Sequence, residues 1–381
     1  MNRFISWFFI LLVWSCKQSK ENASDQQAKA VPIASVTHAK GFKIKDAGEG
    51  IKLIEVSSPW PNAESGFTYA LVQRNATTLT VDENEYDALV RVPVERIVVT
   101  STTHIPALES LGVVDRLVGF PNSQFISSKE TRKRIDSGLV KELGANEAIN
   151  TEILMELSPD LVVGFGISGK NKAYETLQQA GIPLVYNGDW TEETPLGKAE
   201  WVKFFAPFFG LEQKGDSIYK EIEASYATAR ELALKARTKP TILTGGLYKD
   251  VWYVAGGKSW MAEFLRDANT DYLWKDSENT GSIGLSIESV LERAQNADFW
   301  LNPSMHTSYD GLKDANRHYL QFSAYQNQTV YTHTRTTGET GGLLFYEYAP
   351  NRPDVVLKDL IHIFHPDLLP DHEPYFFKPL E

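Results

Sequence analysis

The chain has 381 residues, and its formal net charge of −11 argues against a nucleic-acid partner, which would favour a basic face. Its hydrophobic content of 42% and charged content of 23% are typical of a globular protein, and its single cysteine excludes a disulfide bond within one chain. After a polar N-terminal stretch about 340 residues remain, which is enough for two domains or for one large α/β domain with an addition.

The N-terminus combines a short apolar run with the only cysteine. Residues from Phe4 to Trp14 are apolar apart from Ser6, and the run is too short to cross a bilayer, which needs about 20 residues. It has the size of the apolar part of a signal peptide. The stretch Val13–Cys16 resembles the lipobox of bacterial lipoproteins, whose cysteine thiol receives a diacylglycerol, although Trp14 is bulkier than is usual there. The alternative is a buried N-terminal helix with an incidental cysteine.

We therefore predict a signal peptide over 1–15, a lipid anchor at Cys16 and a polar linker over 16–40. The anchor would hold the protein in the cell envelope, at the periplasmic or outer face of a membrane. No later apolar run approaches 18 residues, so no further membrane segment is expected.

The stretch 41–93 is predicted to form a β-rich extension. Its first part, GFKIKDAGEGIKLIEVSSPW, has turn residues around Gly48 with alternating apolar and polar residues on both sides. The following segment FTYALVQRNA is a further strand candidate.

From Arg96 onward short apolar strands alternate with helices, which predicts βαβ units and parallel sheets. We expect one α/β lobe over 94–210 and a second over 240–381. The segment 211–239 between them is predicted to be a single bridging helix, because apolar residues recur at three- and four-residue steps until Pro240 stops the pattern.

In parallel sheets, ligands bind beyond the carboxyl ends of the strands. Three such ends are expected in the first lobe, at Thr100–His104, Gly164–Gly169 and Asn187–Trp190.

Two stretches of the chain echo each other. TEILMELSPDLVVG (151–164) and SIESVLERAQNADFWLN (286–302) both begin with a polar residue and a glutamate, continue as a short amphipathic helix, and then reach an aspartate and an apolar strand. Glu152 and Glu288 occupy matching places. The simpler reading is that both starts are ordinary helix caps.

In this order of motifs the chain resembles the substrate-binding proteins of ABC importers, in the class that carries iron–siderophore, haem or cobalamin. The resemblance covers about residues 94–381 and is carried by RIVVTSTTHIPALESLG, NTEILMELSPDLVVG, AGIPLV, LSIESVLERAQNADFW and RPDVVLKDLIHIFHPDLLP behind a lipobox. It implies an α/β fold with two Rossmann-like lobes whose parallel sheets are bridged by one long helix. It also implies that Glu152 and Glu288 dock onto arginines of a permease dimer. The extension 41–93 lies outside the usual core of the family.

The candidate ligand contacts are aromatic and polar residues near the expected strand ends and in the loop 338–354. They are Thr103, His104, Trp190, Tyr248, Trp252, Tyr346 and Arg352. The aromatic rings offer flat faces, and the Arg352 guanidinium offers a fork of donors for an anionic chelate. The alternative for Arg352 is that it only begins the last helix together with Asp354.

The eight histidines are scattered, and a bare metal site needs three or four convergent ligands. One alternative is that His104 and His306 face each other across a cleft, but we prefer a role as polar lining or as caps. We expect no metal site of the protein itself and no cofactor.

The sequence thus predicts a lipid-anchored, monomeric solute-binding protein of an ABC importer, and not an enzyme. Its cargo would be a ferric siderophore or a related iron complex, with cobalamin and then haem as alternatives, and its partner a permease dimer. Two other classes stay open: an exported enzyme acting on an aromatic or glycan substrate, and an interaction lipoprotein that works through its 41–93 extension.

Overall fold

The computed structural model describes residues 35–48, 50–75, 82–168 and 171–381, and these residues belong to one compact unit. The predicted signal peptide, the predicted anchor Cys16 and most of the linker 16–40 lie outside them. Within the described ranges, no helix has both the length and the apolar character needed to cross a membrane.

The predicted β-rich extension is present as a four-stranded sheet. Its strands, in spatial order, are β1 (Phe42–Gly48), β2 (Ile51–Val56), β3 (Phe67–Gln73) and β4 (Ala88–Val92). Neighbouring strands are antiparallel except β3 and β4, which are parallel. Ile54, Tyr69 and Val90 point from this sheet into the same hydrophobic core as the first α/β sheet. The extension is therefore continuous with the first lobe, and each fully buried aliphatic side chain contributes about 1.5–3 kcal/mol to that union.

The first α/β sheet is parallel throughout, as the apolar runs of the sequence predict. Its strands, in spatial order, are β11 (Leu184–Tyr186), β10 (Leu161–Gly164), β5 (Ile97–Val99), β6 (Leu117–Phe120) and β7 (Lys141–Glu142). The hairpin β8 (Gly144–Ala145) and β9 (Ala148–Ile149) lies beside it in the chain. Its helices are α1 (His104–Leu111), α2 (Lys129–Asp136), α3 (Thr151–Leu157), α4 (Lys172–Gln179), α5 (Pro195–Ala199) and α6 (Val202–Phe205). Together these elements form what we call the N-lobe.

The C-lobe contains a second sheet, parallel apart from one edge strand. Its strands, in spatial order, are β15 (Asp271–Tyr272), β12 (Thr241–Thr244), β17 (Phe299–Leu301), β18 (Val330–Thr332) and the antiparallel β19 (Lys378–Pro379). A small antiparallel sheet, absent from the sequence prediction, joins β13 (Gly246–Tyr248), β14 (Val251–Ala255) and β16 (Ser282–Leu285). The C-lobe helices are α8 (Trp260–Asp267), α9 (Ile287–Ala294), α10 (Tyr309–Ala315), α11 (Ser323–Gln326), α12 (Leu344–Tyr348) and α13 (Pro353–Phe364).

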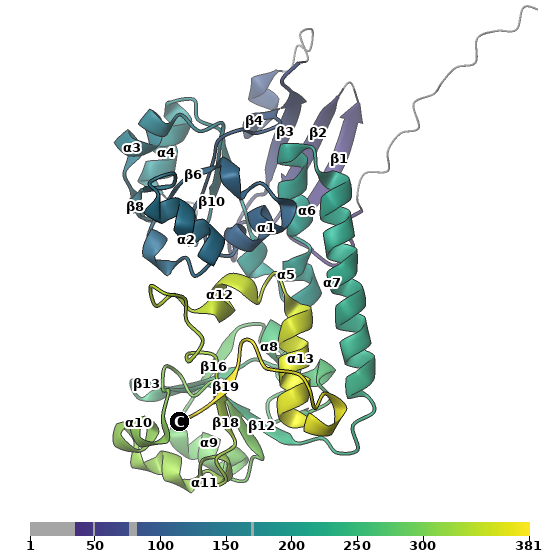
Figure 1. The fold of residues 1–381 in the computed structure, drawn as a ribbon, viewed down its shortest axis with the longest axis vertical. Helices are drawn as coiled ribbons and strands as arrows, with labels where there is room; N and C mark the ends of the chain where they lie inside the picture. Colours follow the sequence, from purple (N-terminus) through teal and green to yellow (C-terminus); the bar gives the residue numbers. More distant parts are fainter. Residues whose placement is uncertain (1–34, 49, 76–81, 169–170) are drawn as a thin grey trace, which may run out of the picture. The chain divides into compact units, whose positions relative to one another are not determined.

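The two lobes share one strand order. Apart from β7 and β19, the N-lobe strands lie in the order β6-β5-β10-β11 and the C-lobe strands in the order β15-β12-β17-β18. In both sheets the first strand in the chain thus lies between the second and the third. The long helix α7 (Glu212–Ala233) connects them and packs against α6 of the N-lobe and α13 of the C-lobe (Figure 1). The predicted bridging helix is confirmed, although it ends before the predicted limit.

The two similar stretches of sequence, 151–164 and 286–302, adopt similar structures. Asn150 caps α3 by accepting from the Ile153 N–H, and Ser286 caps α9 by accepting from the Ser289 N–H. Glu152 and Glu288 are both two residues after their cap. Each helix leads to a buried strand, β10 or β17.

The aspartates of the two copies have the same structural role. Asp160 accepts the backbone N–H groups of Glu95 and Arg96, which precede β5. Asp298 accepts the backbone N–H and the hydroxyl of Thr241, the first residue of β12. Each aspartate therefore fixes the start of the neighbouring central strand, which explains why an aspartate follows the helix in both copies.

Candidate functional site

Three adjoining cavities lie along the facing edges of the two lobes. The N-lobe compartment, about 490 Å³, lies beyond β5, β6 and β10. The C-lobe compartment, about 350 Å³, lies beyond β12 and β17. The side compartment, about 840 Å³, lies between the extension, the loop after β11 and the start of α8. Met305 and Tyr346 line the first two, while Trp260 and Met261 line the last two, so the three cavities form one cleft.

The N-lobe compartment is lined by residues at the ends of parallel strands. Thr100 follows β5, and its hydroxyl bonds with the Tyr174 hydroxyl at 2.9 Å and accepts the Phe165 N–H at 2.8 Å. The Tyr174 hydroxyl also lies 2.9 Å from the Asn146 carboxamide oxygen. This network connects the ends of β5 and β10 with the β8–β9 turn. It therefore fixes the relative positions of the segments that line the compartment.

The C-lobe compartment is aromatic. Tyr248 and Tyr346, both predicted as ligand contacts, line it with side chains that are 64% and 55% exposed. His333, which the sequence analysis did not select, also lines it. Its ring stacks on Phe345 at 4.7 Å, its Nδ1 lies 2.6 Å from the Asn302 carboxamide oxygen, and burial lowers its pKa to about 4. The imidazole is therefore neutral at pH 7. Its position directly after β18 was the sequence signal that could have revealed it.

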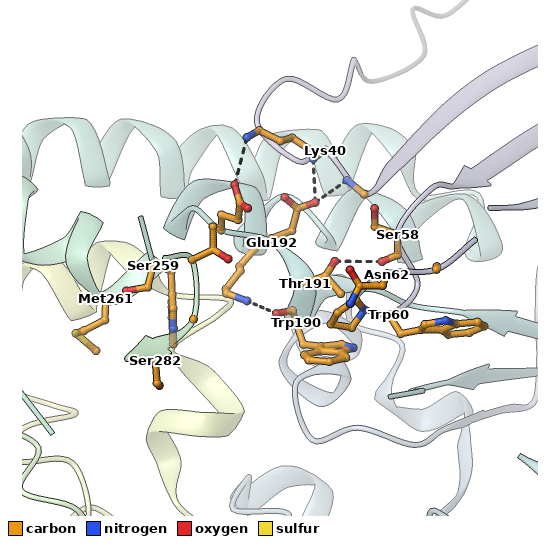
Figure 2. A pocket seen from close by; sticks show the side chains of 18 of the residues that line it. Lys40, Ser58, Trp60, Asn62, Trp190, Thr191, Glu192, Ser259, Met261 and Ser282 are labelled. Atoms are coloured by element: carbon orange, nitrogen blue, oxygen red, sulfur yellow. Dashed lines mark hydrogen bonds and ion pairs between the residues drawn. The ribbon is translucent and has the colours of Figure 1, made fainter. Parts of the chain in front are cut away.

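The side compartment contains the predicted contact Trp190 (Figure 2). The buried Lys198 ammonium donates to the carbonyl oxygens of Asp189 at 3.2 Å and Trp190 at 3.0 Å, and lies 5.2 Å from the Trp260 ring. Burial lowers the pKa of Lys198, while the nearby Asp189 and Glu192 oppose this shift. Lys198 thus holds the backbone of the Trp190 loop through two of its three N–H donors.

The predictions for His104 and Trp252 were wrong. His104 is fully buried against Phe205, and burial lowers its pKa to about 4. Because it is enclosed in the N-lobe, it does not face His306. Trp252 is also fully buried, where its ring stacks on Trp300 at 5.3 Å and its Nε1 donates to the Thr244 carbonyl. Both side chains belong to the core because they point inward from their elements.

Thr103 and Arg352 do not line the cleft either. Thr103 precedes α1, and its carbonyl accepts the Asn351 side chain at 2.9 Å, which ties the lobes together. The Arg352 guanidinium forms a two-pronged ion pair with Asp354, at 2.9 and 3.0 Å, beside a cavity between α1, α7 and α13. The alternative reading, that Arg352 begins the last helix, is confirmed: α13 starts at Pro353.

The described residues that line the three compartments include no arginine. The charged ones are Lys40, Glu147, Glu192, Glu193 and Lys198. Glu192 is buried and accepts the N–H groups of Lys40, Gly41 and the Trp201 indole. The cleft is therefore rich in aromatic side chains and poor in free positive charge.

A segment of the C-lobe reaches across to the N-lobe. The buried Glu347 carboxylate accepts the backbone N–H groups of Ser127 at 2.5 Å and Ser128 at 3.0 Å. A side chain at Gly342 would place its Cβ 2.3 Å from the Phe125 carbonyl oxygen, so only glycine permits this approach. We call these contacts the interlobe clasp. Desolvation raises the pKa of Glu347 to about 7, and the nearby Glu109 adds to the effect against the two N–H donors.

Glu152 and Glu288 lie outside the cleft. Both side chains are exposed in the first turn of a helix, Glu152 on α3 and Glu288 on α9. The Glu288 N–H and the Ser286 hydroxyl lower the pKa of Glu288. Both carboxylates are thus solvated and available to a partner. No group of three or more His, Cys, Asp or Glu side chains within the described ranges is arranged to hold a metal ion.

These features define a class of protein: two α/β lobes of equal strand order, connected by one long helix, with a solute-sized cleft between their strand ends. Residues 97–336 match the periplasmic binding protein family, and the chain belongs to that family. Members of this family are solute-binding proteins of import systems that act in the cell envelope.

Individual relatives agree with this assignment. An uncharacterized lipoprotein of Methanocaldococcus jannaschii is 26% identical over 298 residues, which are 76% of this chain and 69% of that protein. A possible iron-binding, periplasmic solute-binding protein from Staphylococcus epidermidis has a similar fold, with a TM-score of 0.57 at 18% identity. The periplasmic haem-binding protein RhuT from a Roseiflexus species has a TM-score of 0.56 at 23% identity. Each of these structures matches 72% of this chain over 99% of its own length. The predicted fold class is confirmed.

Proposed function

We propose that this protein captures a metal chelate in its interlobe cleft and delivers it to the permease of an ABC importer, without catalysing a reaction. The observation that carries the proposal is the cleft itself, whose aromatic walls lie at the carboxyl ends of two parallel sheets. The names of the similar structures, an iron-binding and a haem-binding protein, support this class of cargo.

The small number of positive charges in the cleft limits the kinds of chelate that it can bind. An anionic chelate needs cationic partners, since a charge buried without one costs several kcal/mol. No arginine lines the three compartments in the described part of the chain, and Lys198 is engaged by two backbone carbonyls. We therefore favour an uncharged ferric siderophore, such as a trihydroxamate complex, with cobalamin second and haem third.

A titration of the purified protein tests the cargo class. Isothermal calorimetry with a neutral ferric trihydroxamate, an anionic ferric tricatecholate, cyanocobalamin and haemin should show binding of a neutral complex and weaker or no binding of the tricatecholate. Native mass spectrometry of protein purified from its own envelope should show a retained chelate. If none of the four compounds binds, the proposed function is wrong.

The anchor and the domain limits belong to the same proposal. We propose lipidation at Cys16, cleavage after 1–15, and a tether over 16–40 that precedes the extension 41–93 and the lobes 94–210 and 240–381. The relative from Methanocaldococcus jannaschii is described as a lipoprotein, which supports the anchor. Cys16→Ala should release the protein from membranes or leave it unprocessed. A mutant that fractionates with membranes at the mature size would contradict the assignment.

We further propose that Glu152 and Glu288 dock onto the two subunits of a permease dimer and that the protein works as a monomer. The support is their matching positions on the repeated helices α3 and α9, because two similar lobes can meet two similar subunits.

A further inference from the structure

The side compartment is built in part by the extension, which lies outside the residues that match the family. The family match begins at residue 97, whereas the loop between β2 and β3 contributes Ser58 and the run 60–63 to the lining. The opposite wall comes from the C-lobe, at the start of α8 and at the residues before β16. The extension thus forms a wall of the cleft in addition to packing on the N-lobe.

The β2–β3 loop is fixed onto the N-lobe by specific contacts. The Thr191 hydroxyl donates to the Ser58 carbonyl at 3.1 Å, and a Cβ at Gly188 would lie 2.3 Å from that carbonyl oxygen. Trp60 packs edge-to-face against Tyr186 at 5.1 Å and against Phe67 at 5.8 Å. The loop therefore has a set position relative to the strand end at β11.

A buried carboxylate fixes the entry to the extension in the same way. Glu192 accepts the backbone N–H groups of Lys40 at 2.9 Å and Gly41 at 2.8 Å, as Figure 2 shows. A charge pair at the rim, Lys40 with Glu193 at 3.6 Å, is solvent-exposed, and such pairs are weak. The compartment thus offers ring faces and amide groups to a ligand and little unpaired charge.

The polar groups of the lining suit an uncharged arm. Asn62 holds a left-handed backbone conformation, with φ of 58°, in the middle of the β2–β3 loop, and Figure 2 shows it beside Trp190. Its carboxamide can both donate and accept. Trp190 and Trp260 supply ring surface from the two lobes. The compartment also joins the C-lobe compartment through four shared residues, Ala255, Trp260, Met261 and Ser282.

We propose that the side compartment is a second subsite of the cleft, which takes an uncharged, ring-bearing arm of the cargo while its chelate core occupies the N-lobe and C-lobe compartments. This inference rests on the proposed function. The extension then determines which chelates bind, and Trp60 acts as a positioning residue that holds the loop.

Two chelates that differ only in such an arm test the subsite. The N-acetyl and N-benzoyl derivatives of ferric desferrioxamine B are both uncharged and share one iron core. The wild-type protein should bind the benzoyl derivative about 3- to 10-fold more tightly in calorimetry, as one aromatic contact provides.

Two variants address opposite walls. Gly281 lines only the side compartment, and a Cβ there would meet no atom within 4 Å, so Gly281→Trp should fill the space without disturbing the fold. Trp60→Ala should remove the ring contacts that hold the β2–β3 loop on the N-lobe. Both variants should abolish the preference for the benzoyl derivative. They should change the affinity for the acetyl derivative less than about 2-fold. Tyr375→Ala, which removes a half-exposed ring outside the three compartments, is the control and should keep the preference.

The results separate the two ideas. If wild type binds a chelate but shows no preference for the arm, or if Gly281→Trp retains the preference, the subsite is disproved and the proposed function stands. Gly281→Trp keeps this test valid if Trp60→Ala fails to fold. If neither desferrioxamine derivative binds, the subsite is disproved, and the proposed function fails as well only if none of the four compounds of the first titration binds.

Discussion

The two lobes have the same scaffold and different cleft edges. A threonine stands at or directly after the end of each central strand, and its hydroxyl meets a buried tyrosine: Thr100 with Tyr174 at 2.9 Å and Thr244 with Tyr272 at 3.1 Å. Beyond this point the lobes diverge: the N-lobe edge is completed by the extension, and the C-lobe edge by the sheet of β13, β14 and β16.

This difference assigns roles to the two kinds of feature. The repeated feature is the pair of capped helices with Glu152 and Glu288, which are exposed and lie outside the cleft lining. In the proposed docking it meets a partner that is itself two-fold. What is not repeated lines the cleft and suits a cargo without such symmetry. The following experiments test this division, from the largest expected effect to the smallest.

The largest effect is expected on uptake, from charge reversal of Glu152 and Glu288. Charge reversal in the double variant Glu152→Lys, Glu288→Lys should abolish uptake of the chelate in cells, because loss of a partly desolvated ion pair costs about 2–5 kcal/mol at each site. Folding and cargo affinity should be unchanged, since both side chains are exposed outside the cleft. Uptake of radiolabelled iron chelate measures the effect.

The matched control lies one helical turn further on. Glu156 and Glu292 are exposed on the same two helices, four residues after the proposed docking residues. The double variant Glu156→Lys, Glu292→Lys should transport at the normal rate. If both double variants behave alike, the docking assignment is wrong and the echo is only a repeated helix cap.

The two strand-fixing aspartates should differ in their contribution to stability. Asp160→Ala and Asp298→Ala each remove hydrogen bonds to a carboxylate, which contribute about 1.5–3 kcal/mol. Asp160 also bonds with the Arg74 guanidinium at 2.7 Å. We expect the larger loss in free energy of unfolding for Asp160→Ala in urea titrations. Equal losses would mean that the Arg74 pair adds nothing.

The interlobe clasp should make stability depend on pH. Glu347 has a pKa of about 7 in the folded chain against 4.5 as its ordinary value. Between these values the folded chain keeps a proton that the unfolded chain releases, so the free energy of unfolding falls as pH rises from about 4.5 to 7 and then levels off. Glu109, Tyr348 and Tyr375 are the titratable groups around it.

Glu347→Gln should remove this contribution. Thermal unfolding between pH 5 and pH 8 should show a smaller loss of stability with rising pH in the variant than in the wild type. An unchanged slope would show that the carboxyl group is ionised throughout this range.

The smallest effect on binding should come from Arg352. Its guanidinium pairs with Asp354 beside α7, so Arg352→Ala should leave cargo affinity within about 2-fold and should lower only stability. Tyr346→Ala, which removes a ring shared by two compartments, should weaken binding by about 3- to 10-fold. A large loss of affinity in Arg352→Ala would show that Arg352 contributes to cargo binding.

Much of the scaffold was predictable from the sequence because local patterns encode it. The apolar run Ile97–Val99 is fully buried in a parallel strand, and the period of 212–233 is that of a helix. The repeated aspartates were visible too, although their hydrogen bonds to a neighbouring strand were not.

The cleft was harder to predict, because strand-end position alone does not reveal the direction of a side chain. Trp252 and Tyr253 are neighbours on one strand, yet the first is in the core and the second lines the C-lobe compartment. His104 is buried by packing against Phe205, and Arg352 is held by a partner two residues away. The role of the β2–β3 loop depends on contacts more than 100 residues apart in the chain, such as Ser58 with Thr191.

The glycine of the interlobe clasp bears on how long a cargo stays bound. The Gly342 backbone lies against the Phe125 carbonyl at one wall of the N-lobe compartment, so a single methyl group there would act as a wedge between the lobes. Gly342→Ala should therefore shorten the residence time of the chelate and leave its rate of association nearly unchanged, as stopped-flow measurements would show. Dissociation, and with it the moment at which cargo can pass to an importer, would then be set by a backbone contact between the two lobes.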